Sequence, residues 1–578
     1  MRSNHRNATP EQVAKIESVI DASLEGLPLP AHEYFEALWH FLTVSEDLPR
    51  MVILRRSGSA TSHGESDETM RLSSLLGDHK YALRYVMEVV KRRLPKAQKL
   101  QKRIQAAEVP YKNAERGLAI ARDYKEAAGL FSLYHSGDAF CTTDESGNHL
   151  WFGFPGHSEA YLALGYSIDV DEPRGNVITA LFSWLRYPDH APAVVKQIGH
   201  SVAPLDMDRL VYDFDEGTAT ELAGIFQNPE SWNLVPLTWV FPWGSRAEVM
   251  SLWNSLQLRC AYHLLAINFG ASRSGIIGGG LDDLCLRIKR GQLVQDIKRV
   301  SNASLDRIVR FVHGMTYGKS TRTPDPALQP LIPCGADEFL VPCMHVVSSK
   351  CGRNLLSLHA RVDEKSFNSQ SAAFEQAMVR VVAGLASACF SFVRTQFHFG
   401  PTGEIDLIIV DERSGTILIG ELRWMIQPGD PRETVNRIKV CREKVMQMEK
   451  KIRGVKNNTP TLLRRLGWKG GKPATWEVVG LVITENFVFR SSDTDIPMLP
   501  MAVLRVGLNS GMNARQLHRW LKSEKWLPKK GQHFEIGPDQ VQFGPHMLGQ
   551  YGLTNLRPLE YIREFLPTTV KEFIEPKA

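Results

Sequence analysis

The chain of 578 residues is several times longer than a typical domain, so two or three separately folded units are expected. With 43% hydrophobic and 23% charged residues, its composition excludes a disordered or fibrous chain and is typical of a globular protein with a buried core. The formal net charge of +6 permits binding to nucleic acid without requiring it, so local clusters of charge have to decide.

The eight cysteines are scattered along the chain and form no Cys-x-x-Cys pair. This spacing argues against a zinc ribbon and against a secreted disulfide framework, and it favours reduced thiols. The polar segment 1–7 has no apolar stretch of the kind found in a secretory signal. The longest apolar run, residues 381–393, is interrupted by serines and is too short to cross a bilayer of about 30 Å. We therefore expect a cytoplasmic protein without a membrane partner.

Residues 1–139 are predicted to form a mainly helical region. A first helix is expected from about Pro10 to Leu24, because Thr9 and Gln12 can form a capping box at its start. Later in the region, basic residues gather between Lys91 and Arg103. This basic segment could contact nucleic acid or a protein partner, and a solvated helix face is the alternative.

Residues 140–365 are predicted to form a mixed α/β region, whose role the sequence does not assign. Up to about Trp243 the chain has short apolar runs broken by Gly and Pro, which are typical of strands or packed loops. From Ala247 to Asn268 apolar residues recur at steps of three and four, which predicts a long amphipathic helix packed on the core.

A polar segment at residues 362–371 is the expected boundary to a small α/β unit at residues 366–512. Asn368 or Ser369 is expected to cap a helix that ends near Phe390 and carries Glu375 in an early turn. A strand at 392–399, a hairpin, a basic helix at 432–453 and a strand at 477–484 are predicted to follow. The tail, residues 513–578, is expected to contain a helix near 514–522 and aromatic strands near Phe534 and Phe543, and it could complete the core.

The hairpin contains the most informative residues of the sequence. Its strands are predicted at 403–411 and 416–424, and each carries an acid among apolar residues, Asp406 and Glu421. Buried carboxylates are costly unless they are paired or bind a metal. Because the hairpin places its strands side by side, both carboxylates can reach one hard cation, with the backbone carbonyl of Leu422 as a third oxygen ligand.

An acid, a spacer and Glu-x-Arg across a hairpin, after a helix that carries Glu375, resemble the PD-(D/E)xK nuclease superfamily. The resemblance covers residues 370–512 and implies a restriction-endonuclease-like αβββαβ core with a mixed sheet. It further implies Asp406 and Glu421 as ligands of Mg²⁺ or Mn²⁺, and Glu375 as a helical acid that supports the metal site. Arg423 occupies the position of the lysine of that superfamily.

The arginine is a departure from the pattern, because a guanidinium stays protonated and cannot act as a base. The basic helix that follows could supply a substitute, and Lys444 is our candidate for it. Residues of the same helix are also candidates for nucleic-acid binding, with Gln447 expected to position the substrate. These candidates are Arg437, Lys439, Lys444, Gln447 and Lys451.

The resemblance implies a metal-dependent phosphodiesterase that cleaves nucleic acid, for which we expect DNA. A nuclease joined to a large region that recognises a protein partner or a trigger is similar to prokaryotic defence and mobile-element proteins. Two alternatives stay open at this point, a nuclease-like binding module without activity and an interaction scaffold. In a purely structural explanation, Asp406 forms a local cap or pair and Glu421 forms an ion pair with Arg423 or another neighbour.

Overall fold

The computed structural model describes most of the chain. The described residues are 6–55, 65–95, 100, 104–153, 156–170, 180–181, 183–185, 187–206, 209–226, 235–274, 280–428, 431–471, 475–485, 494–557 and 560–574. They form two compact units, each built from separate stretches of sequence. Unit 1 comprises Met1–Ile16, Ala128–Glu172 and Asn368–Ala578, and unit 2 comprises Glu17–Ala127 and Pro173–Phe367.

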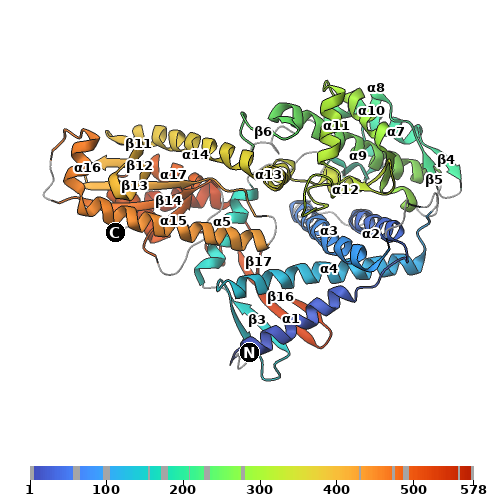
Figure 1. The fold of residues 1–578 in the computed structure, drawn as a ribbon, viewed down its shortest axis with the longest axis horizontal. Helices are drawn as coiled ribbons and strands as arrows, with labels where there is room; N and C mark the ends of the chain where they lie inside the picture. Colours follow the sequence, from blue (N-terminus) through green and yellow to red (C-terminus); the bar gives the residue numbers. More distant parts are fainter. Residues whose placement is uncertain are drawn as a thin grey trace. The chain divides into compact units, whose positions relative to one another are not determined.

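The core of unit 1 is a five-stranded mixed sheet with the strand order β11-β12-β13-β14-β15 (Figure 1). Pairing is antiparallel from β11 to β13 and parallel from β13 to β15. The two central strands are apolar and buried along nearly their whole length, as expected for strands covered on both faces. The strands are β11 (Val393–His398), β12 (Glu404–Asp411), β13 (Thr416–Arg423), β14 (Glu477–Thr484) and β15 (Met498–Pro500).

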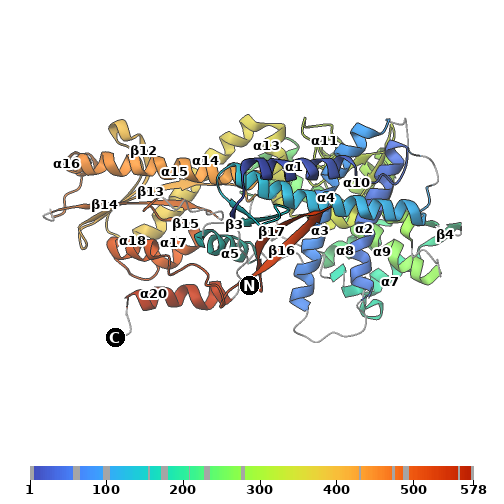
Figure 2. The same cartoon turned by 90° about the horizontal axis from the view of Figure 1, so that it is seen from below.

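Helices cover both faces of this sheet. Figure 2 shows α14 and α15 along one face and α17 and α18 along the other. The parallel pair β13 and β14 requires a crossover connection, which α15 and the short helix α16 provide. The helices are α14 (Glu364–Ser387), α15 (Pro431–Asn457), α16 (Thr459–Leu466), α17 (Met501–Leu508) and α18 (Ala514–Ser523).

The order of elements from α14 to β14 agrees with the predicted order of helix, three strands, helix and strand, and the general α/β class is confirmed. That this core is restriction-endonuclease-like stays a prediction. The predicted start of the first helix is wrong, because α14 begins at Glu364 and the Asp363 carboxylate accepts a hydrogen bond from the Ser366 amide. The tail helix is confirmed as α18, which begins with a capping box and packs against β13 and β14.

A second five-stranded sheet of unit 1 joins three distant parts of the chain, in the order β1-β2-β3-β17-β16. We expected that the tail could complete the core, but its strands do not extend the core sheet. They form a hairpin whose strand β17 pairs in parallel with β3. The strands are β1 (Arg6–Asn7), β2 (Phe140–Thr143), β3 (His149–Gly153), β16 (Glu535–Phe543) and β17 (His546–Thr554). Helices α5 (Gly156–Val170) and α20 (Leu566–Ile574) complete the unit, with a π-helical turn (Tyr561–Phe565) before α20.

Unit 2 is mainly helical. The four long helices α1–α4, of which α1 begins and α4 ends in sequence assigned to unit 1, confirm the prediction of a mainly helical first part of the chain. Helix α1 starts at Pro10 as predicted, with both hydrogen bonds of the Thr9–Gln12 capping box in place. The predicted helix at 247–268 is confirmed within α9. The helices are α1 (Pro10–Glu25), α2 (Tyr34–Arg55), α3 (Glu65–Arg93), α4 (Glu108–His135), α7 (Ala193–His200), α8 (Glu216–Ile225), α9 (Arg246–Ser274), α10 (Arg290–Val300), α11 (Leu305–Gly314), α12 (Cys343–Val347) and α13 (Cys351–Val362).

The strands of unit 2 are short, and they confirm the mixed character that the sequence predicts after residue 140. They form one three-stranded sheet and two hairpins. The strands are β4 (Ala203–Asp206), β5 (Arg209–Val211), β6 (Val240–Phe241), β7 (Gly244–Ser245), β8 (Leu286–Lys289), β9 (Ile332–Pro333) and β10 (Glu338–Val341), with 3₁₀ turns at Pro188–His190 and Leu281–Asp283. Part of the predicted basic segment, residues 96–99 and 101–103, lies outside the described residues.

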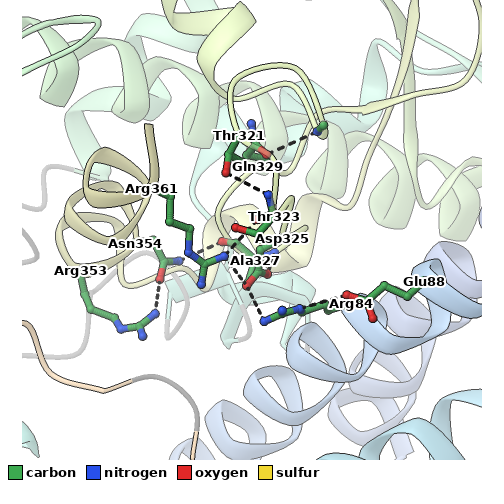
Figure 3. A network of polar contacts seen from close by, with 11 residues as sticks. Arg84, Glu88, Thr321, Thr323, Asp325, Ala327, Gln329, Arg353, Asn354 and Arg361 are labelled. Atoms are coloured by element: carbon green, nitrogen blue, oxygen red, sulfur yellow. Dashed lines mark hydrogen bonds and ion pairs between the residues drawn. The ribbon is translucent and has the colours of Figure 1, made fainter. Parts of the chain in front are cut away.

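A polar network around the buried Asp325 in unit 2 holds the irregular segment 321–329 against α3 and α13 (Figure 3). The Asp325 carboxylate lies 3.4 Å from the Arg361 guanidinium and 3.9 Å from that of Arg84. Asn354 donates to the carbonyl of Ala327 over 3.1 Å. Segment 321–329 has no regular backbone pairing. These contacts supply the partners that its buried polar groups require.

All eight cysteines are unbridged. No helix in the described part of the chain is long and apolar enough to cross a membrane. Each unit is built from stretches that are not consecutive in the sequence, whereas we expected four consecutive parts. That those parts are separate domains stays a prediction. The division between Phe367 and Asn368 falls inside the polar segment that we expected to be a boundary.

The contact between α7 and α9 in unit 2 provides a test of packing. A Cβ atom added at Gly199 would lie 2.6 Å from Cβ of Phe269, a distance that real Cβ atoms essentially never show. We therefore expect Gly199→Ala to lower the free energy of unfolding by about 1–3 kcal/mol, as overpacking does. Gly291→Ala in α10 is the matched control, since nothing lies within 4 Å of its added Cβ. Chemical denaturation of both variants checks this, and equal midpoints would contradict the described packing.

Candidate functional site

The β12–β13 hairpin brings the two predicted carboxylates together. Leu407 pairs with Gly420, so the next position along each strand places Asp406 opposite Glu421. Side chains at opposite positions of an antiparallel pair share one face of the sheet. The tight connection is made by Gly415 at φ 61°, a conformation that glycine adopts without cost. Glu421 is buried and Asp406 is half-buried, among strands that are otherwise apolar.

Asp406 interacts with the backbone of the neighbouring strand. Its Oδ2 accepts a hydrogen bond from the Leu422 amide over 2.8 Å, at the level where the regular pairing of the hairpin has ended. Burial, and then the nearby charge of Glu421, raise the pKa of Asp406 from 3.8 to about 6, although the Leu422 amide and the two nearby lysines oppose this. The two carboxylates are thus close enough to repel each other.

Two lysines of α15 bind the Glu421 carboxylate, one on each oxygen. Lys444 Nζ lies 2.8 Å from Oε1, and Lys451 Nζ contacts Oε2. The lysines are seven residues apart, two helical turns, and so lie on the same side of α15. Lys444 was expected near the carboxylates and is found there. Lys451 was expected to bind nucleic acid, whereas the structure places it, buried, on Glu421.

Arg423 and Glu375 are paired with each other. Arg423 Nη1 lies 2.8 Å from Glu375 Oε1, and the Trp424 amide donates to the same oxygen over 3.2 Å. Burial raises the pKa of Glu375, and the Arg423 charge partly offsets this effect. Arg423, which stands at the lysine position of the PD-(D/E)xK pattern, is therefore paired with Glu375 of α14. The cations that contact Glu421 are instead Lys444 and Lys451 of α15.

The other basic candidates have different surroundings. Lys439 and Gln447 are exposed on α15. Arg437 donates to the carbonyl of Ile426 over 3.0 Å and so holds the chain between β13 and α15. Arg442 forms an ion pair with the buried Asp138, a contact that the sequence does not predict. No local signal could have indicated it, because the two residues are 304 positions apart.

The donor set fits a hard divalent cation in part. Asp406 and Glu421 offer carboxylate oxygens, which Mg²⁺ and Mn²⁺ prefer, and a cation between them would relieve their repulsion. Leu422 takes part through its amide in the structure, whereas its carbonyl was expected as a ligand. Within the described residues no group of three or more His, Cys, Asp or Glu side chains could hold a metal. Two carboxylates therefore leave most of the coordination shell to water, backbone and substrate oxygens.

Comparisons of the chain with protein-family models, with curated proteins and with solved structures found no match in any of the three. The fold and the site define an α/β protein with two carboxylates and two lysines at one end of a β-hairpin.

The raised pKa of Asp406 predicts a pH-dependent effect on stability. Ionisation of Asp406 costs stability as the pH rises from about 4 to about 6, and the full cost is present above that range. Asp406→Asn keeps an acceptor for the Leu422 amide without the charge. We therefore expect the variant to melt at a higher temperature than the wild type at pH 8, with the gain vanishing below about pH 4.

Asp411, at the other end of β12, is the control with the opposite sign. Burial raises its pKa, but hydrogen bonds from the Ala514 amide and the Ser414 hydroxyl outweigh this effect and hold the pKa below its ordinary value. Asp411→Asn should therefore melt lower than the wild type at pH 8, and the deficit should shrink below about pH 4. Thermal unfolding between pH 3 and pH 8 measures both variants. A destabilised Asp406→Asn at pH 8 would contradict the described electrostatics.

Proposed function

We propose that unit 1 is a metal-dependent nuclease that hydrolyses phosphodiester bonds of DNA at Asp406 and Glu421. One observation carries the proposal: two carboxylates lie side by side on a β-hairpin, and lysines from the crossover helix reach one of them. A buried carboxylate with a raised pKa, such as Asp406, beside a second acid and positive charge is typical of functional sites.

Asp406 and Glu421 would hold Mg²⁺ or Mn²⁺, with the Leu422 carbonyl as a further oxygen ligand. When bound, the cation would activate a water molecule for attack on phosphorus and stabilise the charge on the phosphate oxygens. The resemblance assigned Glu375 to support of this site; since Glu375 is held by Arg423, its contribution would be to fix the end of β13 where the site lies.

The lysines differ in what they can do. Hydrolysis forms a bond between the water oxygen and phosphorus and breaks the bond to the leaving oxygen. The water gives up a proton, the leaving oxygen takes one up, and negative charge grows on the phosphate between these events. Lys444, with a side chain 19% exposed, can donate from Nζ to a phosphate oxygen that approaches from solvent. Lys451 is 11% exposed and more enclosed, so its role would be to hold Glu421 in position.

Helix α15 also carries exposed basic residues, which can contact a phosphate backbone. At about 100° per residue they lie on a different side of the helix from Lys444 and Lys451. These residues are Lys439, Lys450, Arg453 and Lys456, and Gln447 is exposed between the two site lysines. A defence or mobile-element context and a protein partner for the N-terminal region stay predictions.

A second candidate is a nucleic-acid-binding module without activity. It is favoured by the pairing of both Glu421 oxygens with lysines and of Arg423 with Glu375, which satisfies the charges without a metal. The two functions differ in cleavage. A nuclease cleaves DNA and loses this activity in the Asp406→Ala variant, whereas a binding module does not cleave DNA and keeps its salt-sensitive affinity for DNA in that variant.

Cleavage of supercoiled plasmid and single-stranded DNA tests the main proposal. With Mg²⁺ or Mn²⁺ we expect cleavage by the full chain, and none with chelator. Glu421→Ala and Asp406→Ala should lower the rate at least about a thousandfold, and Lys444→Met about a hundredfold, because each removes charge at the reacting phosphate. Lys525→Met, an exposed lysine after α18, is the control and should cleave like the wild type. Intact DNA under every condition would overturn the proposal.

We expect loss of the Arg423–Glu375 pair to affect the stability of the protein more than its rate of cleavage. Arg423→Ala leaves a largely enclosed acid without its cation, so we expect a loss of about 1 kcal/mol in unfolding free energy, reduced by partial exposure of the pair. Its cleavage rate should fall less than that of Lys444→Met. Adding Glu375→Gln should restore much of the stability, because the unpaired acid is then neutral. A hundredfold or greater loss of cleavage in Arg423→Ala would instead assign Arg423 to the chemistry.

A further inference from the structure

The edge strand β11 has an irregularity at the level of the two carboxylates. Thr395 pairs with Leu407 and Phe397 pairs with Ile405, so Gln396 falls opposite Asp406, yet the regular pairing skips this position. Asp406 in turn falls opposite Glu421. One row across three neighbouring strands therefore carries Gln396, Asp406 and Glu421, and it begins at the exposed edge of the sheet.

Gln396 has an unusual backbone conformation for a residue inside a strand. Its φ is +50°, in the left-handed region, which costs energy for any residue with a Cβ. Two other described residues besides glycine share this property, Glu524 and Asn555, and both lie where an element ends. Gln396 instead has regular pairs on either side of it. Strain of this kind persists where the surrounding structure imposes it, and it concentrates at functional sites.

The side chain of Gln396 is available to a ligand. The residue is exposed, and within the described part of the chain its amide makes no hydrogen bond. A neutral amide suits this place, because a lysine here would pair with Asp406 and an acid would repel a phosphate. The amide N–H group can donate to a phosphate oxygen without changing the charge balance of the carboxylates and lysines.

We infer that Gln396 is a substrate-positioning residue, whose side-chain amide donates a hydrogen bond to a phosphate oxygen of the nucleic acid at the Asp406–Glu421 site. This inference rests on the proposed function, since it assigns the edge of β11 to the same phosphodiester substrate. The left-handed backbone at Gln396 marks this position of the row as irregular. A local break in the pairing of β11 with no functional role is the alternative, and it assigns no role to the amide.

The test uses the full chain and fluorescein-labelled single-stranded and duplex 20-mers. Binding is measured with Ca²⁺ in place of Mg²⁺, and cleavage is then measured with Mg²⁺. The variants are Gln396→Gly, Gln396→Ala and Gln396→Glu, and Asn555→Gly is the matched control because its φ is also 50°. Glycine relieves the strain at both positions, so both glycine variants should melt at a higher temperature than the wild type.

Only the changes at Gln396 should weaken DNA binding. We expect Gln396→Gly and Gln396→Ala to raise the Kd and the KM about tenfold with a smaller change in kcat, as loss of a hydrogen bond to a charged group does. Gln396→Glu should be weaker still, because it repels the phosphate. Asn555→Gly should bind and cleave like the wild type.

The outcomes separate this inference from the proposed function. Unchanged Kd and KM in Gln396→Gly and Gln396→Ala would overturn the inference while leaving the nuclease intact. A wild-type protein that binds DNA through Gln396 but never cleaves it would support the inference and overturn the nuclease. A protein that neither binds nor cleaves DNA would overturn both.

Discussion

The ion pairs of Glu421 with Lys444 and Lys451 are the interaction on which the site in unit 1 depends. A buried carboxylate needs compensation, and both of its oxygens receive it from α15. This helix is also the crossover that the parallel pair β13–β14 requires. Helix α15, which this topology requires, therefore also places Lys444 and Lys451 at the Glu421 carboxylate. Loss of either lysine would disturb the position of α15 as well as the charge of the site.

The charges of the site balance before any ligand arrives. Asp406 and Glu421 supply two negative charges, and Lys444 and Lys451 supply two positive ones. A divalent cation that entered alone would leave an excess of positive charge in a poorly solvated place. A phosphate that entered with it would restore the balance and give Lys444 a new partner. On the proposed function, metal and substrate therefore bind in a mutually favourable way.

The sequence was sufficient for those parts of the site whose determinants are local. The hairpin, its two acids and the basic helix follow from periodicity, a short turn and spacing along one helix, and Lys444 was placed correctly for that reason. Lys451 stands at the same heptad spacing, but its burial depends on where α15 crosses the sheet. The pairing of Arg423 with Glu375 and of Arg442 with Asp138 could not be predicted, because each depends on the tertiary arrangement of distant segments. The irregular backbone at Gln396 has no signal in the sequence at all.

The extent of unit 1 shows why a short motif describes this protein incompletely. The resemblance covers residues 370–512, but unit 1 also contains the N-terminal strand β1, the β2–β3 hairpin and the C-terminal hairpin β16–β17. Arg442 of α15 is paired with Asp138, just before β2, and the Asp138 side chain is only 1% exposed. The helix that positions both lysines is therefore anchored on a segment outside the motif. A buried acid that lost this arginine would remain uncompensated, so the motif and the rest of unit 1 depend on each other for stability.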